Sequence, residues 1–257
     1  MRDTVSACAP GRVELLGNHT DYNEGVVLGA AINRVICVSG VKNDRSIRLT
    51  SADFGAVEIH PADLRPLQEG RWATYILGVA DELRKLHVPI RGFTADVSGD
   101  LPIGAGLSSS AAFALATALF LLKLFPARLE PLEIAKACQR AEHHCVGVQS
   151  GLLDQVISLF GRADHAVFVD CRSEDIRYVP FPAELALMIA ESGKKRELDR
   201  ANTTCAEKRR MPLLAHSVPA RCATLVRQNW IVAAICRRCC AVVLRMSSAR
   251  TNASGVH

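Results

Sequence analysis

Hydrophobic and polar positions alternate along several short segments in the way expected of half-buried β-strands. Residues 31–41 and 46–60 carry β-branched runs that are broken by Asn43-Asp44 and by Asp53-Phe54-Gly55. This pattern predicts a meander of antiparallel strands. Further strands are predicted at residues 93–98, 166–170 and 185–191.

Four other segments have the composition or the 3.6-residue period of helices. Residues 72–86 place their apolar side chains on one face and their charged side chains on the other. Pro131 is suited to the first turn of a helix. Because helices and strands do not alternate regularly, the pattern indicates an α+β fold. The predicted helices are residues 72–86, 112–122, 131–145 and 152–160.

The character of the chain changes at about residue 200, where the periodicity fades and arginine and cysteine become frequent. Residues 201–257 hold nine Lys and Arg against the single acid Glu207, a net charge of +8, which leaves the preceding residues at −3. A mildly acidic body gives no reason to expect a nucleic-acid partner. The longest apolar run, residues 111–122, is too short to span a bilayer, and no leader segment is recognisable. We therefore expect a cytoplasmic protein with no membrane partner.

Cysteines are also unevenly distributed, with five before residue 205 and five after residue 204. Those of the first group are scattered among apolar neighbours, which predicts buried or free thiols in a reducing compartment. They are Cys8, Cys37, Cys138, Cys145 and Cys171.

The richest local signal is the loop from Pro102 to Ala112, with the sequence PIGAGLSSSAA, between a predicted strand and a predicted helix. Unpaired N–H groups and the positive end of the helix dipole meet at such a point, and glycines let phosphate oxygens approach the main chain. The loop therefore predicts an anion-binding site, with the phosphates of ATP as the natural ligand. The simpler interpretation is that Gly104 and Gly106 form a tight turn and the serines cap the helix.

Two other segments are equally dense in polar and glycine residues. They are Ala9 to Asn23, with the sequence APGRVELLGNHTDYN, and Glu142 to Gln155. Together with the loop they resemble the galactokinases of the GHMP small-molecule kinase family. The loop resembles the ATP motif, Arg12 to Asn23 resembles the galactokinase signature, and Gly151 to Gln155 resembles the segment of the catalytic aspartate.

The resemblance runs from about Ala7 to Glu197 and implies the α+β GHMP kinase fold. Residues 1–182 would form a largely complete N-terminal domain of the ribosomal protein S5 domain 2-like type. Residues 183–200 would begin a C-terminal GHMP domain that is mostly missing, and residues 201–257 would be a divergent tail.

The resemblance also assigns roles in phosphoryl transfer, a reaction that depends on positioning and charge neutralisation. Asp154 would accept or orient the proton of the sugar C1 hydroxyl, and Arg12 would pair with it and stabilise the transferring group. Ser110 and Glu142 would bind Mg²⁺, which prefers hard oxygen ligands. The residues expected to bind ATP are Gly104, Ala105, Gly106, Leu107, Ser108, Ser109, Ser110, Ser51 and Trp72.

A hydroxyl-rich sugar needs side chains with several donors and acceptors. Here Asn18 stands where the family has a glutamate, which leaves the choice of sugar open. The residues that the resemblance implies for sugar binding are Asn18, His19, Thr20, Asp21, Gly151 and Asp154.

Taken singly, several of these residues have simpler interpretations. Arg12 and Asp154 could form an ordinary salt bridge, and Glu142 could be a solvated carboxylate on a helix. His19 could be a common loop histidine, and Trp72 could belong to the core.

Beyond Leu198 the family continues towards a Tyr-Asn-x-Arg-Arg segment, whereas this chain has Asn202 to Glu207. One set of codons for those residues in the genetic code is AAT-ACA-ACC-TGC-GCA-GAA, and read from the third base it gives Tyr-Asn-Leu-Arg-Arg. We therefore hypothesise a single-nucleotide shift near codon 202. The alternative is a real but divergent extension, in which Trp230 to Ile235 could form a partner helix.

The sequence thus predicts a galactokinase that uses ATP and Mg²⁺ to phosphorylate galactose at C1, without an obligate protein partner. Three alternatives remain open: a GHMP kinase acting on N-acetylgalactosamine or arabinose, a non-catalytic galactose and ATP sensor, and an inactive truncated product. The Ser110-Ala111 pair favours catalysis over the sensor, because some related sensors lack it.

Overall fold

The computed structural model describes residues 4–17, 20–43, 45–65, 67, 71–147, 150–182, 184–191 and 230–236. The chain divides into two compact units, residues 1–181 and residues 182–257. Each unit is described by itself.

The first unit is built on a seven-stranded sheet in the order β4-β3-β5-β2-β6-β7, with β1 paired to β2. The long strand β2 pairs with β1 along one edge and with β5 and then β6 along the other. All pairs are antiparallel except β3 with β5. The strands are β1 (Val5–Leu16), β2 (Val26–Lys42), β3 (Ile47–Ser51), β4 (Gly55–Ile59), β5 (Phe93–Gly99), β6 (His165–Asp170) and β7 (Asp175–Pro180).

The predicted antiparallel meander is only partly correct. The hairpin of β3 and β4 forms around Asp53-Phe54-Gly55 as expected, but β5 lies between β2 and β3 and pairs in parallel with β3. Strands β1 and β7 were not predicted. β1 mixes glycine, proline and charged residues, and β7 is mostly exposed, so neither has a clear apolar alternation.

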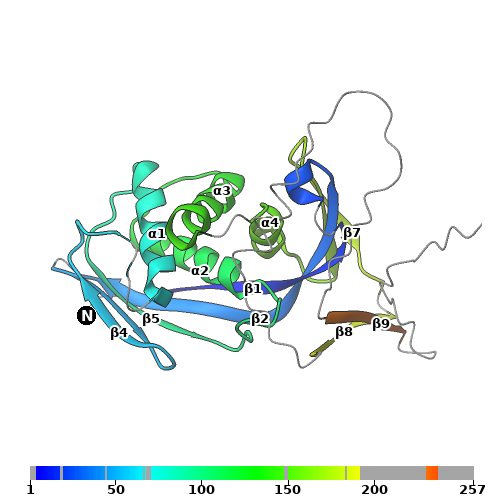
Figure 1. Ribbon diagram of the computed structural model, residues 1–257, viewed down its shortest axis with the longest axis horizontal. Helices are drawn as coiled ribbons and strands as arrows, with labels where there is room; N and C mark the ends of the chain where they lie inside the picture. The colour runs from blue at the N-terminus through cyan, green and yellow to red at the C-terminus, as the bar shows by residue number, and fades with distance from the viewer. Residues whose placement is uncertain are drawn as a thin grey trace, which may run out of the picture. The chain divides into compact units, whose positions relative to one another are not determined.

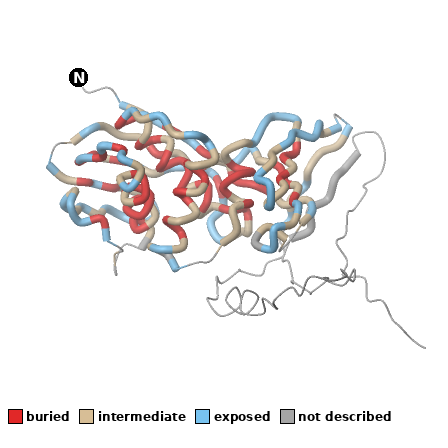
Figure 2. The backbone as a smooth tube through the Cα atoms, turned by 90° about the horizontal axis from the view of Figure 1, so that it is seen from above, coloured by how far each residue is buried: buried red, intermediate tan, exposed pale blue. Residues whose placement is uncertain are grey.

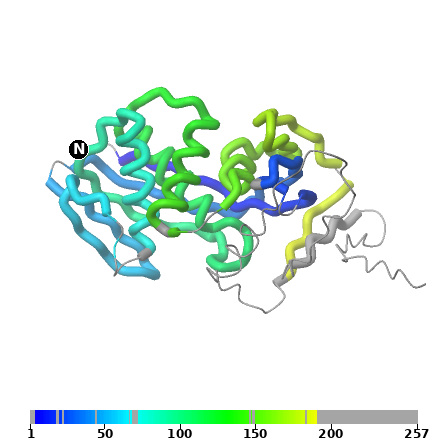
Figure 3. The backbone as a smooth tube through the Cα atoms, turned by 45° about the horizontal axis from the view of Figure 1, so that its top comes forward, coloured from blue at the N-terminus to red at the C-terminus, as the bar shows by residue number. Residues whose placement is uncertain are grey.

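The helices pack together over one face of the sheet (Figures 1 and 3). The four predicted helices are confirmed, but the third ends at Ala141 and continues as a π-helical turn, η2 (Glu142–Val146). α2 is buried on nearly all sides because it contacts β1, β2 and the other three helices. The helices are α1 (Arg71–Lys85), α2 (Ser109–Leu124), α3 (Pro131–Ala141) and α4 (Leu153–Phe160), with a short 3₁₀ turn η1 (Asp21–Asn23).

Buried residues concentrate where these helices meet the central strands (Figure 2). Phe93 of β5 and Phe120 of α2 are fully buried and pack edge to face, with ring centroids 5.9 Å apart. Such contacts join the strand before the glycine-rich loop to the helix after it, so both ends of the loop are anchored in the core. Within the described residues, none of the helices has the length and apolarity required to cross a membrane.

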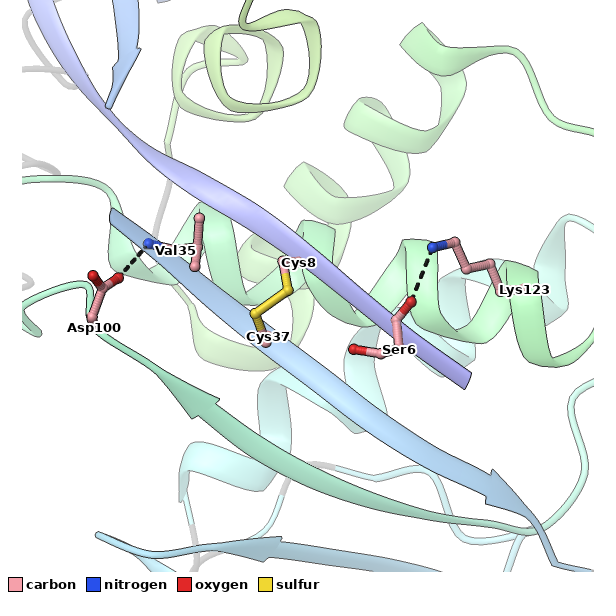
Figure 4. Close-up of a disulfide and its surroundings, with 6 residues drawn as sticks. All are labelled: Ser6, Cys8, Val35, Cys37, Asp100 and Lys123. Atoms are coloured by element: carbon pink, nitrogen blue, oxygen red, sulfur yellow. Dashed lines mark hydrogen bonds between the residues drawn. A yellow bond between two sulfur atoms is a disulfide. The ribbon is translucent and has the colours of Figure 1, made fainter. Parts of the chain in front are cut away.

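The expectation of free thiols is wrong for one pair, because Cys8 of β1 and Cys37 of β2 form a disulfide (Figure 4). The two residues are direct partners in the antiparallel register, which brings their side chains together. Cys138, Cys145 and Cys171 are free, as expected.

Reduction of this disulfide is expected to lower the free energy of unfolding by about 3 kcal/mol, because the crosslink restricts the unfolded chain. Urea unfolding with and without reductant measures the change. A Cys8→Ser, Cys37→Ser variant is the control and should not respond to reductant. Equal responses of the variant and the original chain would contradict the prediction.

In the second unit, β8 (Leu185–Glu191) pairs antiparallel with β9 (Trp230–Cys236). β8 was predicted as a strand. The partner helix considered for Trp230 to Ile235 is incorrect, since this apolar segment with β-branched residues forms a strand. Asn202 to Glu207, on which the frame-shift hypothesis depends, lies outside the described residues.

Candidate active site

The glycine-rich loop connects β5 to α2 and has an unusual backbone. Gly104 and Gly106 have φ values of 74° and 73°, and Ser108 has a φ of 57°. A Cβ at Gly104 would meet open space, so the loop presents main chain to solvent at this point. These conformations let successive N–H groups converge, as they do in known anion-binding loops.

The first residue after β5 ties the loop to the sheet. Asp100 accepts a hydrogen bond from the backbone N–H of Val35 at 2.8 Å (Figure 4) and one from Arg34 at 2.7 Å. These contacts hold the pKa of Asp100 below its usual value. The first residue of the loop is therefore fixed to β2.

Strand β1 passes directly against the loop. The backbone N–H of Arg12 donates to the carbonyl oxygen of Leu107 at 3.1 Å. A Cβ at Gly11 would lie 2.8 Å from that same oxygen and 2.5 Å from Leu101, so only glycine permits this approach. The approach places the Arg12 side chain at the loop, where Nη1 donates to the carbonyl oxygen of Gly106 at 3.0 Å.

Arg12 and Asp154 meet although they are 142 residues apart in the sequence. Nε and Nη2 of Arg12 donate to Oδ1 of Asp154 at 2.7 and 2.5 Å. The Oδ2 atom accepts a hydrogen bond from the Ser108 hydroxyl at 2.6 Å. The arginine side chain is 10% exposed and the aspartate side chain 26%, so the pair is largely shielded while the carboxylate remains accessible.

Glu142 occupies the π-helical turn at the end of α3 and is buried, which excludes the interpretation as a solvated carboxylate. Its Oε2 atom accepts hydrogen bonds from Ser150 and Gln155, both at 2.9 Å. Burial raises the pKa of Glu142 to about 7; the charge of Asp154 adds to this, while Ser150, Ser110 and Gln155 oppose it.

The π-helical turn is held by a second buried carboxylate, Glu82 of α1. Arg140 donates to Oε2 of Glu82 at 2.9 Å, and Nδ1 of His144 lies 3.2 Å from Oε1. Because Arg140 and His144 lie on either side of Glu142, these contacts fix the segment that carries it. π-Helical turns within α-helices are frequent at functional sites.

The residues around Glu142 suit a divalent cation. Its Oε1 atom is buried without a hydrogen-bond partner, and the Ser110 hydroxyl lies close enough to affect its titration. A Mg²⁺ ion commonly binds through one or two protein oxygens together with substrate phosphates. The described residues contain no cluster of three or more His, Cys, Asp and Glu side chains that could hold a metal alone.

The titration of Glu142 predicts a pH dependence of stability when no divalent cation is present. Its pKa rises from 4.5 to about 7 on folding, so the folded chain binds this proton more tightly than the unfolded chain. The resulting stabilisation is complete below about pH 4.5 and is lost as pH rises through about 7. The slope approaches about 1.4 kcal/mol per pH unit. Urea unfolding at several pH values measures it, and an unchanged slope in Glu142→Gln would contradict the assignment.

Two of the residues expected at the sugar lie together. A Cβ at Gly151 would fall 1.6 Å from Oδ2 of Asp21, so the carboxylate lies directly against the glycine. Thr20 uses its hydroxyl to close the turn: its single proton is shared between the carbonyl oxygens of Gly17 at 2.6 Å and Val26 at 2.8 Å. Asn18 and His19 lie outside the described residues.

The residues expected at the adenine lie near one end of the sheet. Ser51 is the last residue of β3 and pairs with Val97 of β5, shortly before the loop. Trp72 of α1 stacks on Phe54, with ring centroids 6.4 Å apart, and its Nε1 atom is buried without a partner. Phe54 was not identified from the sequence because it stood only as part of a turn.

Sequence reasoning also missed Ser150, Gln155 and Cys171. Ser150 and Gln155 orient Glu142, and Gln155 is fully buried. The backbone N–H of Cys171 donates to the carbonyl oxygen of Gly25 at 2.9 Å, and burial, with the charges of Asp21 and Asp170, raises the pKa of its thiol to about 11. The position of Gln155 directly after Asp154 was the one available signal.

Comparison with known families agrees with this geometry. Residues 74–162 match the N-terminal domain of the GHMP kinases, and residues 2–42 match the galactose-binding signature of galactokinases. The chain contains an N-terminal domain of the GHMP kinase family and the galactose-binding signature of galactokinases. The family fold predicted from the sequence is confirmed.

Individual relatives point in the same direction. A galactokinase of Roseiflexus sp. (strain RS-1) is 41% identical over 191 residues, covering 74% of this chain and 49% of that protein. The crystal structure of Lactococcus lactis galactokinase complexed with galactose matches with a TM-score of 0.73 at 30% identity, covering 77% of this chain and 52% of that one. Methanococcus jannaschii mevalonate kinase shares the fold, with a TM-score of 0.60 at 18% identity, covering 77% and 63%. The chain thus spans about half the length of the galactokinases that it matches.

Proposed function

We propose that this chain carries the catalytic half of a galactokinase, which transfers the γ-phosphoryl group of ATP to the C1 hydroxyl of D-galactose to give galactose 1-phosphate. The observation that carries the proposal is the Arg12–Asp154 pair, which joins the galactokinase signature to the Asp154 segment and contacts the glycine-rich loop from both partners. An ordinary structural salt bridge would not require contacts to an anion-binding loop from both partners.

In this reaction Asp154 orients the sugar hydroxyl and accepts its proton as the bond to phosphorus forms. Arg12 offsets the charge of the carboxylate and of the transferring phosphoryl group. The loop and the first turn of α2 supply N–H groups to the phosphates of ATP. The adenine of ATP is expected to bind beside Trp72, Phe54 and Ser51.

Ser110 and Glu142 would hold Mg²⁺. When bound, the ion neutralises charge on the phosphates of ATP. The hydrogen bonds from Ser150 and Gln155 keep Oε2 of Glu142 occupied and leave Oε1 for the ion.

The residues that we propose to bind the sugar are Asn18, His19, Thr20, Asp21 and Gly151. The close approach of Asp21 to Gly151 joins the signature to the segment of Asp154, which supports one common site. Because Asn18 is uncharged where the family has a glutamate, N-acetylgalactosamine and arabinose are the alternative substrates. The protein is proposed to act in the cytoplasm without an obligate protein partner.

The sequence from Asn202 to Glu207, which can be read as the family segment in a neighbouring frame, favours one further candidate, an inactive product of a shifted reading frame. A coupled kinase assay with galactose, N-acetylgalactosamine and arabinose tests both proposals. It compares the 257-residue chain with a version continued in the neighbouring frame after codon 202. Activity in both chains would support the galactokinase proposal, activity only in the continued chain would support the inactive product, and activity in neither would reject the proposed function.

A further inference from the structure

Ser108 combines a left-handed backbone with burial, which no other described non-glycine residue does. Five non-glycine residues in the described part of the chain have a positive φ: Glu24, His87, Ser108, Asp164 and Glu174. Four of them are exposed, and only Ser108 is buried. A left-handed conformation is unfavourable for residues with a Cβ, and positions 104 and 106 in the same loop are glycines. A buried side chain at position 108 therefore needs a reason beyond turn geometry.

The hydroxyl of Ser108 does not perform the usual function of a serine at this place. Ser108 occupies the N-cap position of α2, but its side chain makes no capping hydrogen bond to the helix. It donates instead to Oδ2 of Asp154 at 2.6 Å. The interpretation of this serine as a simple helix cap is therefore wrong.

The contacts from Arg12 cannot orient the Asp154 carboxylate alone. Both of them reach Oδ1, and rotation about the last torsion of an aspartate is only weakly restricted. With Oδ1 as the fixed point, the direction of Oδ2 depends on Ser108, the one donor among the described residues that reaches it.

We propose that Ser108 is a positioning residue that fixes the orientation of the Asp154 carboxylate and couples it to the conformation of the glycine-rich loop. Two donors occupy Oδ1 and one occupies Oδ2, so the free lone pair that accepts the sugar hydroxyl is on Oδ2. The inference rests on the proposed function, because it names the oxygen at which that reaction takes its proton.

The first test is a double-mutant cycle of Ser108→Gly and Asp154→Asn, measured by urea unfolding of the full chain. Glycine keeps the left-handed backbone and removes only the side chain. The effect of the double variant on the unfolding equilibrium constant is expected to differ at least about tenfold from the product of the two single effects. The reason is that both substitutions remove the same hydrogen bond, and this bond is to a charged group. His87→Gly has a similar φ of 64° and is the matched control, expected to be additive with Asp154→Asn. Additive effects of Ser108→Gly would overturn the inference.

The second test separates positioning from simple support of the fold. In Ser108→Gly, kcat is expected to fall at least about tenfold, while the KM values for sugar and ATP change less than about threefold. A coupled cycle with an unchanged kcat would overturn the positioning role. If the original chain phosphorylates no sugar, the proposed function fails and the positioning role fails with it. An additive cycle in an active chain overturns the inference about Ser108 alone.

Discussion

Asp154→Asn is expected to reduce kcat for sugar phosphorylation by about 10²- to 10⁴-fold, because the amide cannot accept the proton of the sugar hydroxyl. Asparagine has the same shape, and its side-chain oxygen can still accept from Arg12, so the fold should be retained. Initial rates at saturating ATP and sugar measure the loss, and an unfolding curve checks the fold.

Asp63→Asn is the matched control for this substitution. Asp63 is an exposed carboxylate paired with Arg65 on the surface, so its charge can be removed without affecting the proposed site. Equal rates for Asp154→Asn and Asp63→Asn would contradict the assignment of Asp154.

Arg12→Met is expected to affect both turnover and stability. Methionine retains the apolar stem but leaves the Asp154 carboxylate and the Gly106 carbonyl without this donor. Loss of a charge that stabilises the transition state typically costs about 10²- to 10³-fold in kcat. Removing one partner of a largely shielded ion pair costs roughly 3 kcal/mol in the free energy of unfolding. Initial rates and urea unfolding measure the two effects.

Arg177→Met provides the comparison for stability. Arg177 forms an ion pair with Asp175 in which both side chains are substantially exposed, and such pairs contribute little. If Arg12→Met and Arg177→Met changed stability equally, the Arg12–Asp154 pair would not be the structural link described above.

The parts of the fold that depend on local pattern could be predicted from the sequence. α1 has a periodic apolar face, and the glycines and serines before α2 indicate a loop that leads into a helix. Which strands are neighbours in the sheet was harder to predict, because strand pairing depends on residues far apart in the chain. The insertion of β5 between β2 and β3 and the pairing of Cys8 with Cys37 both required the register of the sheet.

The same distinction applies to the candidate site. Arg12 and Asp154 were linked through resemblance to a family, since no spacing rule relates residues 142 positions apart. The burial of Glu142 depends on how the π-helical turn packs against α1 and α4, and its local sequence favoured a solvated carboxylate. The hydrogen bond from Ser108 to Asp154 depends on a left-handed backbone that serine rarely adopts, so the sequence predicted only contact with ATP, with a helix cap as the simpler interpretation.

The central claim is that the loop, the signature and the Asp154 segment form one site for phosphoryl transfer to a sugar. Phosphorus NMR of the purified chain with ATP, Mg²⁺ and galactose tests it most directly. The account predicts a growing signal of a sugar phosphate ester in the original chain and its loss in Asp154→Asn. Ester formation that is unaffected by Asp154→Asn would contradict the account.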